Sequence, residues 1–247
     1  TRQGFYNHAT NLISRFAAYS LMIYHTIIMP INNKVNCVFF CGTAGALRRE
    51  AFEEVGGWNS NSITEDSDLS VRLLLQGYKT VYLDIETPSE VPHTFESFIK
   101  QQMRWCYGNA RVFFDNGYDI LFSRNLSLAQ RIMIIFITLA NLIAPFVVLM
   151  TIFGLGGWFF GEPSLFNIQD IIDLFSRFLI TAGFMVAGLI TLKKRNRLEE
   201  VHYLILSSLT LGLVLSVANG IAFLRASANR GLGWFCTPKL ANEEALK

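Results

Sequence analysis

Three long apolar stretches limit the folds that this chain of 247 residues can adopt. Residues 203–224 contain no charged side chain, residues 130–153 contain none after Arg131, and residues 171–192 contain two near one end. A helix of 22 residues is about 33 Å long, enough to cross the ~30 Å hydrocarbon core of a bilayer. Buried helices of a large soluble protein are the alternative, but three such runs in succession favour helices that cross a membrane.

Charged residues are distributed unevenly along the chain. Only 16% of the residues are charged and 51% are hydrophobic, whereas a soluble domain is about 25% charged. Residues 48–104 carry many charges and residues 126–192 carry few. The shift predicts a catalytic region at 1–125, which begins with amphipathic helices, and a membrane region at 126–247 with about three apolar helices.

Net charge and cysteine content do not indicate nucleic-acid binding, a disulfide framework or a metal site. A net charge of +2 does not favour nucleic-acid binding, and four scattered cysteines are too few for a disulfide framework. Cys37 and Cys41 share one face of a predicted strand, but nothing nearby completes a four-ligand metal site. We therefore interpret them as buried thiols.

The basic segment KKRNRLEE, residues 193–200, has four basic residues among its first five. Such a loop is typical of the cytoplasmic side of a membrane. Basic residues after residue 224 favour the same side for the C-terminus, which conflicts with a single crossing by residues 203–224. Either one apolar segment is interfacial or re-entrant, or the C-terminus lies outside, so the sequence leaves the number of crossings open.

The first 125 residues alternate between predicted strands and helices. KVNCVFFCG (34–42) and YKTVYLD (78–84) have the apolar content and flanking turn residues of strands. A short helix from Arg48 to Val55 and a second helix after Thr64 lie between them, which predicts an α/β sheet. Two or three strands are too few for a complete doubly wound domain.

Helices are predicted at both ends of this region. Residues 4–29 have apolar residues at roughly helical spacing, and they predict one or two amphipathic helices that end at Pro30 and could lie on a membrane surface. After the second strand, Thr94 can cap a long helix from Phe95 to about Asp115.

Glu65, Asp66 and Asp68 crowd the start of the helix that follows Thr64. A helix N-terminus stabilises negative charge, so capping by solvated acids is the simplest interpretation. At a loop-to-helix junction on the edge of a sheet, however, Asp66 could also act as a general base. Asp66 and Asp68 also have the spacing of a divalent-cation pair, although such pairs usually end a strand.

The segment QQMRW, residues 101–105, combines side chains that suit a phosphorylated sugar ligand. Gln101 and Arg104 are neighbours on one helix face, and Trp105 lies on the adjoining row. A guanidinium binds phosphate oxygens through two hydrogen bonds, an amide adds a neutral donor, and an indole offers a flat apolar surface. The alternative is an Arg–Trp pair stacked on the protein surface.

The order of four segments, FFCGTAGALRREAFEEVGGW, TED, SEVP and QQMRW, resembles membrane-embedded family-2 glycosyltransferases. That family includes cellulose synthases and plant mannan and glucan synthase-like enzymes. The resemblance implies an α/β fold, namely the second half of a GT-A-like nucleotide-sugar transferase domain, followed by transmembrane helices. It also implies that Asp66 is the catalytic base. The residues to which it assigns donor and acceptor binding are Thr64, Glu65, Gln101, Arg104 and Trp105.

WFCTPK, residues 234–239, resembles the segment that covers the bound nucleotide in this family, although Trp234 stands where Phe is common. The resemblance extends donor contacts to Thr237 and Lys239. The chain departs from the family because no nucleotide-binding strand and no separate metal-holding acid pair precede Thr1. We therefore expect a truncated piece, with the ligands of the implied Mg²⁺ or Mn²⁺ outside it.

The function implied by the resemblance is inverting transfer of a sugar from a nucleotide-sugar to a growing β-linked polysaccharide. In processive relatives, helices like those at 130–224 form a channel for the product. Two alternatives are transfer of a single sugar to a lipid acceptor and a non-catalytic membrane subunit. The implied partners are a nucleotide-sugar donor, a glycan or lipid acceptor and the membrane, without nucleic acid. The implied location is a plasma, inner or Golgi membrane, with several crossings and the catalytic part in the cytosol.

Overall fold

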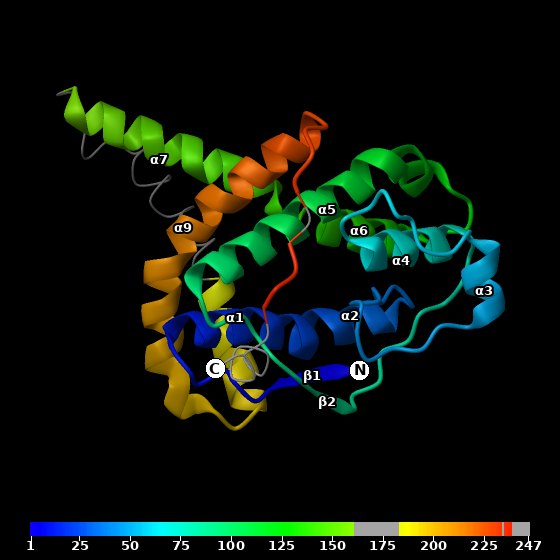
Figure 1. Ribbon diagram of the computed structural model, residues 1–247, viewed down its shortest axis with the longest axis horizontal. Coiled ribbons are helices and arrows are strands. Elements are labelled where there is room, and N and C mark those ends of the chain that lie inside the picture. Colours follow the sequence, from blue (N-terminus) through cyan, green and yellow to red (C-terminus); the bar gives the residue numbers. More distant parts are fainter. Residues whose placement is uncertain (161–182, 234, 239–247) are drawn as a thin grey trace.

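The computed structural model describes residues 1–160, 183–233 and 235–238. The described chain is mostly helical, and helices α5 (Phe95–Phe122) and α9 (Val201–Ser227) pack against each other (Figure 1). The apolar stretch predicted at 171–192 lies outside the described residues up to residue 182, and residues 183–194 are helical.

The only sheet among the described residues consists of two parallel strands, β1 (Arg2–Phe5) and β2 (Glu86–Ser89). Both predicted strands, 34–42 and 78–84, are wrong, so the structure supports the α/β class only weakly. A strand requires a ladder of hydrogen bonds to a neighbouring strand. Side chains bond to the first segment instead.

The hydrogen bonds of residues 34–42 show how this segment is held. The N–H of Val38 donates to Thr80 Oγ1 at 2.6 Å, and the N–H of Phe40 donates to Ser70 Oγ at 2.8 Å. Residues 78–84 keep the alternation of a strand, because Tyr82 is buried while Val81 and Leu83 are exposed along a cavity of about 970 Å³. The sequence pattern is therefore present without the sheet that it predicted.

The N-terminal helices are longer and more buried than predicted. Helix α1 (Leu12–Ile23) continues through a π-helix, η1 (Tyr24–Ile28), into α2 (Met29–Lys34). The predicted end at Pro30 is wrong, because Pro30 lies in the first turn of α2, where a missing N–H is tolerated. Residues 12–30 are all buried or half-buried, so this helix packs against the rest of the described chain along much of its length.

The short helices between the two extended segments agree with the prediction. Helix α3 (Arg49–Glu54) covers nearly the predicted range, and α4 (Glu65–Leu75) begins directly after Thr64. Helix α5 begins at Phe95, where Thr94 Oγ1 accepts the N–H of Ser97 at 3.3 Å. It continues past the predicted end at Asp115, because its C-terminal half packs on α6 (Leu128–Thr138).

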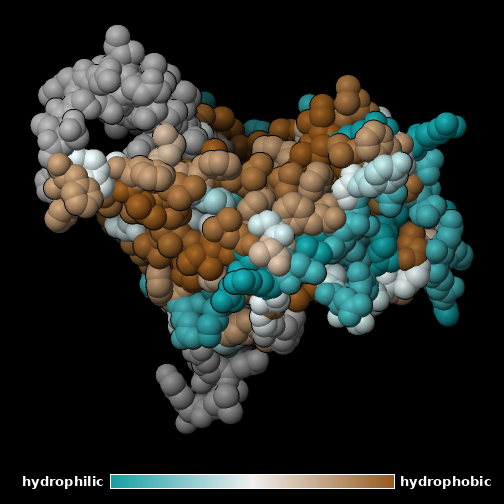
Figure 2. Space-filling model, turned by 90° about the horizontal axis from the view of Figure 1, so that it is seen from above, coloured by the Kyte–Doolittle hydropathy of each residue, from teal (hydrophilic) through white to brown (hydrophobic). Residues whose placement is uncertain are grey.

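Three described helical segments, 12–34, 140–157 and 198–227, are long and apolar enough to cross a membrane. The predicted stretch 130–153 is divided at Leu139, so its second part, η2 (Ala140–Leu142) and α7 (Ile143–Phe159), supplies one of these segments. In the most apolar windows, 6% of the residues are buried for 140–157 and 44% for 12–34. Segment 140–157 therefore suits lipid contact best, and apolar side chains cover much of the upper face of the molecule (Figure 2).

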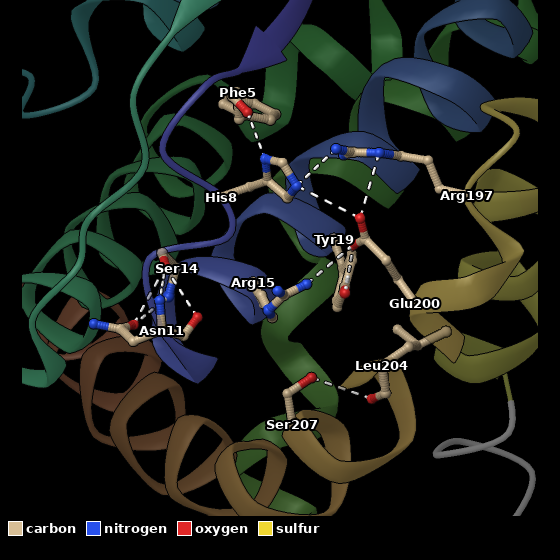
Figure 3. A network of polar contacts seen from close by, with 10 residues as sticks. All are labelled: Phe5, His8, Asn11, Ser14, Arg15, Tyr19, Arg197, Glu200, Leu204 and Ser207. Carbon is tan, nitrogen blue, oxygen red and sulfur yellow. Dashed lines mark hydrogen bonds and ion pairs between the residues drawn. The ribbon is translucent and has the colours of Figure 1, made fainter. Parts of the chain in front are cut away.

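A buried polar network joins the N-terminal region to the base of α9 (Figure 3). Glu200, which ends η3 (Leu198–Glu200), is 8% exposed and accepts a hydrogen bond from Tyr19 Oη at 2.8 Å. Three further side chains lie within 3.5 Å of its carboxylate: His8, Arg15 and Arg197. The network fixes α1 against the loop that precedes α9.

Candidate active site

The first turn of α4 holds Asp66 in a defined position. Asp66 Oδ1 accepts the N–H of Ser67 at 2.8 Å, and its backbone carbonyl accepts Ser70 Oγ at 2.7 Å. Ser70 Oγ also accepts the N–H of Phe40, so the start of α4 is tied to the segment that leads into Cys41 and Gly42. Two elements that are far apart in the sequence therefore meet at the carboxylate of Asp66.

Gly42 lies directly beside this carboxylate. Its φ of +70° is in the left-handed region, which glycine adopts without strain. A Cβ atom at this position would lie 3.1 Å from Asp66 Oδ2. The absence of a side chain therefore lets the backbone at Gly42 lie close to the carboxylate of Asp66.

Helix α5 brings the QQMRW segment to the same place. The Nη1 of Arg104 donates to the carbonyl of Ile63 at 3.2 Å, three residues before Asp66. Trp105 is half-buried at the next position of α5. Arg104 therefore lies near the turn that carries Asp66, close enough for its charge to act on that carboxylate.

The surroundings of Asp66 raise its pKa above the ordinary value of an aspartate. Burial is the largest cause and the negative charge of Glu65 adds to it, whereas the N–H of Ser67 and the guanidinium of Arg104 oppose the increase. A carboxylate with a raised pKa is a stronger base when it is ionised. This suits removal of a proton from an attacking hydroxyl group.

Cys41 also lies near Asp66, but its thiol does not suit nucleophilic chemistry. Burial and, to a smaller extent, the negative charge of Asp66 raise the pKa of Cys41 to about 12. Since the thiolate is the reactive form, Cys41 stays protonated and inert at neutral pH. Asp66 is the better candidate for the reacting group.

Three buried polar atoms at this site have no hydrogen-bond partner among the described residues. They are Thr64 Oγ1, Gln101 Oε1 and Arg104 Nε. Buried polar atoms usually have partners, so a group of unpartnered ones marks a place where a polar ligand can supply them. All three belong to residues that the family resemblance assigned to ligand binding.

The C-terminal segment 235–238 crosses α5 at the same end of the helix (Figure 1). Gln101 Nε2 donates to Thr237 Oγ1 at 3.2 Å, and Lys100 Nζ lies 4.9 Å from the centre of the Phe235 ring. Thr237 is therefore placed beside Gln101. Trp234 and Lys239 lie outside the described residues.

The remaining acids of this region do not form a metal site. Asp68 is buried and paired with Arg72 at 2.8 Å, and Arg72 also donates to the backbone carbonyls of Val55 and Gly57. Asp68 is thus occupied by a structural ion pair and does not join Asp66 in holding a cation. In the described parts of the chain, no group of three His, Cys, Asp or Glu residues could hold a metal ion. The residues present do not fit the implied divalent cation.

Gly108 allows the close packing of α5 on the Thr64–Asp66 turn, and no motif described above includes it. A Cβ atom on Gly108 of α5 would lie 2.3 Å from both Oγ1 and Cγ2 of Thr64. The absence of a side chain lets α5 approach the Thr64–Asp66 turn closely. An isolated glycine inside an otherwise helical pattern was the signal that could have identified it.

A comparison with known protein families matches most of this chain. The model of the family described as Glycosyl transferase family group 2 covers residues 1–192. The chain belongs to this family. Its Thr-Glu-Asp turn and its QQMRW helix both lie within the matched range.

Curated relatives are plant enzymes of this family. The chain is 34% identical over 151 residues to probable glucomannan 4-beta-mannosyltransferase 7 of Oryza sativa subsp. japonica, covering 59% of this chain and 26% of the relative. It is 36% identical over 138 residues to glucomannan 4-beta-mannosyltransferase 1 of the same plant, covering 55% and 26%. For glucomannan 4-beta-mannosyltransferase 9 of Arabidopsis thaliana the identity is 34% over 137 residues, with the same coverage. The chain spans about a quarter of the length of these relatives.

Proposed function

We propose that this chain supplies the catalytic base and part of the ligand site of a membrane-bound inverting glycosyltransferase. The enzyme moves a hexose from a nucleotide-sugar donor to a growing β-linked polysaccharide. The observation that carries the proposal is the meeting of Asp66, Gly42 and Arg104, with unpartnered polar atoms around them.

The reaction needs one proton acceptor and one group that offsets charge on the leaving diphosphate. Asp66 takes the proton of the acceptor hydroxyl, whose oxygen then forms a bond to the anomeric carbon. The bond between that carbon and the diphosphate oxygen breaks on the opposite face, so the configuration inverts. Arg104, whose Nε lacks a partner among the described residues, offsets the negative charge that develops on the diphosphate.

The remaining predicted site residues have supporting roles in this proposal. Thr64 and Glu65 adjoin the base, Trp105 offers a surface for a sugar ring, and Gln101 joins α5 to Thr237 at the donor. Each of these roles follows the family resemblance. Lys239 belongs to the same proposal as a donor contact.

A polysaccharide acceptor is supported by the relatives, which are named glucomannan 4-beta-mannosyltransferases. A cytosolic catalytic part is supported by the basic segment 193–197. Arg195 Nε donates to Thr26 Oγ1 at 2.9 Å, and Arg197 contacts His8, so this segment lies on the side of the catalytic region. The positive-inside rule places such a segment in the cytosol.

The proposal is tested with the full-length protein in isolated membranes. The membranes are incubated with radiolabelled nucleotide hexoses, and the products are sized before and after digestion with β-specific glycosidases. We expect label in long β-linked chains. Asp66→Asn should lower the rate about 10²- to 10⁴-fold, whereas Glu53→Gln, an exposed acid on α3, should leave it unchanged.

Two outcomes would contradict parts of the proposal. Label recovered only in single-sugar lipids would replace the polysaccharide with a lipid acceptor. An Asp66→Asn protein with unchanged activity would show that Asp66 is not the base and would favour a non-catalytic subunit.

A further inference from the structure

Ser70 joins the turn that carries Asp66 to the segment that leads into Gly42. Its Oγ donates to the backbone carbonyl of Asp66 at 2.7 Å and accepts the N–H of Phe40 at 2.8 Å. A serine hydroxyl has one hydrogen to donate and lone pairs that accept, so the two bonds can form together. Ser70 is 1% exposed, which leaves little competition from water. One buried hydroxyl therefore sets the spacing between two elements that are far apart in the sequence.

The bond of Ser70 to Asp66 alone would have a simple structural interpretation. Serines inside helices often bond to the carbonyl four residues earlier, as Ser208 of α9 does to Leu204 at 2.6 Å. Ser70 differs because its hydroxyl also accepts an N–H from outside its own helix. Alanine is a better helix former at such a position, but it could not make this second bond.

The segment that contains Phe40 has no strand beside it to fix its position. The only sheet in the described part of the chain consists of β1 and β2, and side-chain hydroxyls hold the N–H groups of Val38 and Phe40 instead. The bond to Ser70 is the nearer of the two to Gly42, whose backbone lies beside Asp66 Oδ2. Phe40 and Ser70 both line the cavity of about 970 Å³, so the segment has room to move once this bond is lost.

We propose that Ser70 is a positioning residue, which acts on Asp66 by holding the Gly42 segment against its carboxylate. The inference rests on the proposed function, in which Asp66 is the base. Burial is the largest cause of the raised pKa of Asp66. If the Gly42 segment moves away, water reaches the carboxylate and its pKa falls. The base is then weaker as well as less well placed.

Ionisable side chains from four elements act electrostatically on Asp66: Glu65 on its own helix, Arg104 on α5, Cys41 on the Gly42 segment and Tyr24 on η1. Replacing Ser70 by an uncharged residue adds or removes no charge among them. The thiol and the phenol are neutral at acid pH. A displaced acid limb in a Ser70 variant therefore reports the hydration of Asp66 and not a new charge.

The pH dependence of transfer by the full-length protein in isolated membranes tests this inference. The substrate is the radiolabelled nucleotide hexose that the wild-type protein uses. Ser70→Ala removes both bonds. We expect it to lower kcat about 10-fold and to move the acid limb of kcat/KM to lower pH by about half a unit, because the base is misplaced and better hydrated.

Two further variants separate positioning from stability. Ser70→Thr keeps the hydroxyl, and its acid limb should stay at the wild-type position. Ser207→Ala is the matched control, because it removes another fully buried serine hydroxyl, whose bond to the carbonyl of Leu204 at 3.2 Å stays within α9. It should lower stability and leave the acid limb unchanged.

An acid limb that stays in place in Ser70→Ala, or that moves equally in Ser207→Ala, would overturn the inference, because Ser70 would then matter for stability alone. A limb displaced as far in Ser70→Thr as in Ser70→Ala would also overturn it. If Ser70→Ala fails to fold, Ser70→Cys takes its place. A thiol is a weak donor and acceptor, so the limb should move less in the same direction, and an unmoved limb would overturn the inference.

Failure of this inference is distinguishable from failure of the proposed function. Full activity in Asp66→Asn would count against the proposed function. An inactive Asp66→Asn protein, together with an unmoved limb in Ser70→Ala, would count against the role of Ser70 alone.

Discussion

Asp66 is held in surroundings that disfavour its charge, yet it must be ionised to act as the base. Its raised pKa means that it gains a proton at a higher pH than an ordinary aspartate does, about 3.9. A protonated carboxyl cannot accept the acceptor's proton, so activity falls as pH falls through this pKa. We predict that the acid limb of the pH dependence of kcat/KM lies above that of an ordinary aspartate.

Arg104 offers a matched comparison for this pH profile. Its positive charge opposes the raised pKa of Asp66, so Arg104→Gln should move the acid limb to higher pH. Arg104→Lys keeps the charge and should leave the limb near its wild-type position, although both variants lose rate. The measured quantity is the pH at which kcat/KM falls on the acid side. If Arg104→Gln does not change this pH, the two charges do not interact.

The same carboxylate has a cost in stability. Because the folded pKa is raised, Asp66 contributes stability when it is protonated, below its unfolded pKa, and this contribution is lost as pH rises through the folded pKa. Asp66→Asn should therefore raise Tm at neutral pH, and the difference should disappear in acid. Asp119→Asn, at an exposed position, is the control and should change Tm little at either pH. A lower Tm for Asp66→Asn at neutral pH would contradict this assignment.

At the scale of elements, the site depends on how closely α5 approaches α4. Gly108→Ala would place a methyl group 2.3 Å from Thr64, so the start of α4 must shift. We expect a loss of about 1–3 kcal/mol in stability, together with a lower kcat. Gly117→Ala on the same helix meets only the Phe113 ring, at 3.7 Å, and should gain up to about 1 kcal/mol from helix propensity. Thermal unfolding of both variants checks the pair, and equal effects would contradict it.

Helices could be predicted from sequence because their signals are local. Thr94 was identified as a cap, and the spacing of Gln101 and Arg104 placed both on one face of α5. Strands were not predictable in the same way, because residues 34–42 show an apolar strand pattern without a neighbouring strand. A strand depends on non-local partners, and an apolar pattern alone carries no information about them.

Other features depended on contacts that no local pattern reveals. The π-helix at Tyr24–Ile28 joins α1 to α2, so that Pro30 falls in the first turn of α2 rather than at the end of a helix. The approach of Gly42 to Asp66 required knowing which side of α4 the preceding segment crosses. By contrast, the ion pair of Asp68 with Arg72 could have been predicted from the sequence, because the two residues are four apart on a helix.

At the scale of the whole molecule, the catalytic region and the membrane helices form one packed body, and two of the contacts between them bear on the position of the site. One is the contact of α5 with α9, and the other is the network around Glu200. The first carries the site, and the second joins α1 to the basic segment that precedes α9. Together they keep Asp66 and Arg104 at a fixed position relative to α9.

The network around Glu200 should therefore be among the most sensitive parts of the molecule outside the site. Glu200→Ala leaves the half-buried Arg15 and Arg197 without their carboxylate and should cost about 3 kcal/mol, the lower end of the range for breaking a buried ion pair. Tyr19→Phe removes one hydrogen bond to a charged group and should cost about 1.5–3 kcal/mol. Glu199→Ala, the exposed neighbour, is the control and should stay within about 0.5 kcal/mol of wild type. The stability of the three variants is measured as the fraction of protein that remains monodisperse after heating in detergent. If Glu200→Ala is as stable as Glu199→Ala, α9 is held by its apolar contacts alone.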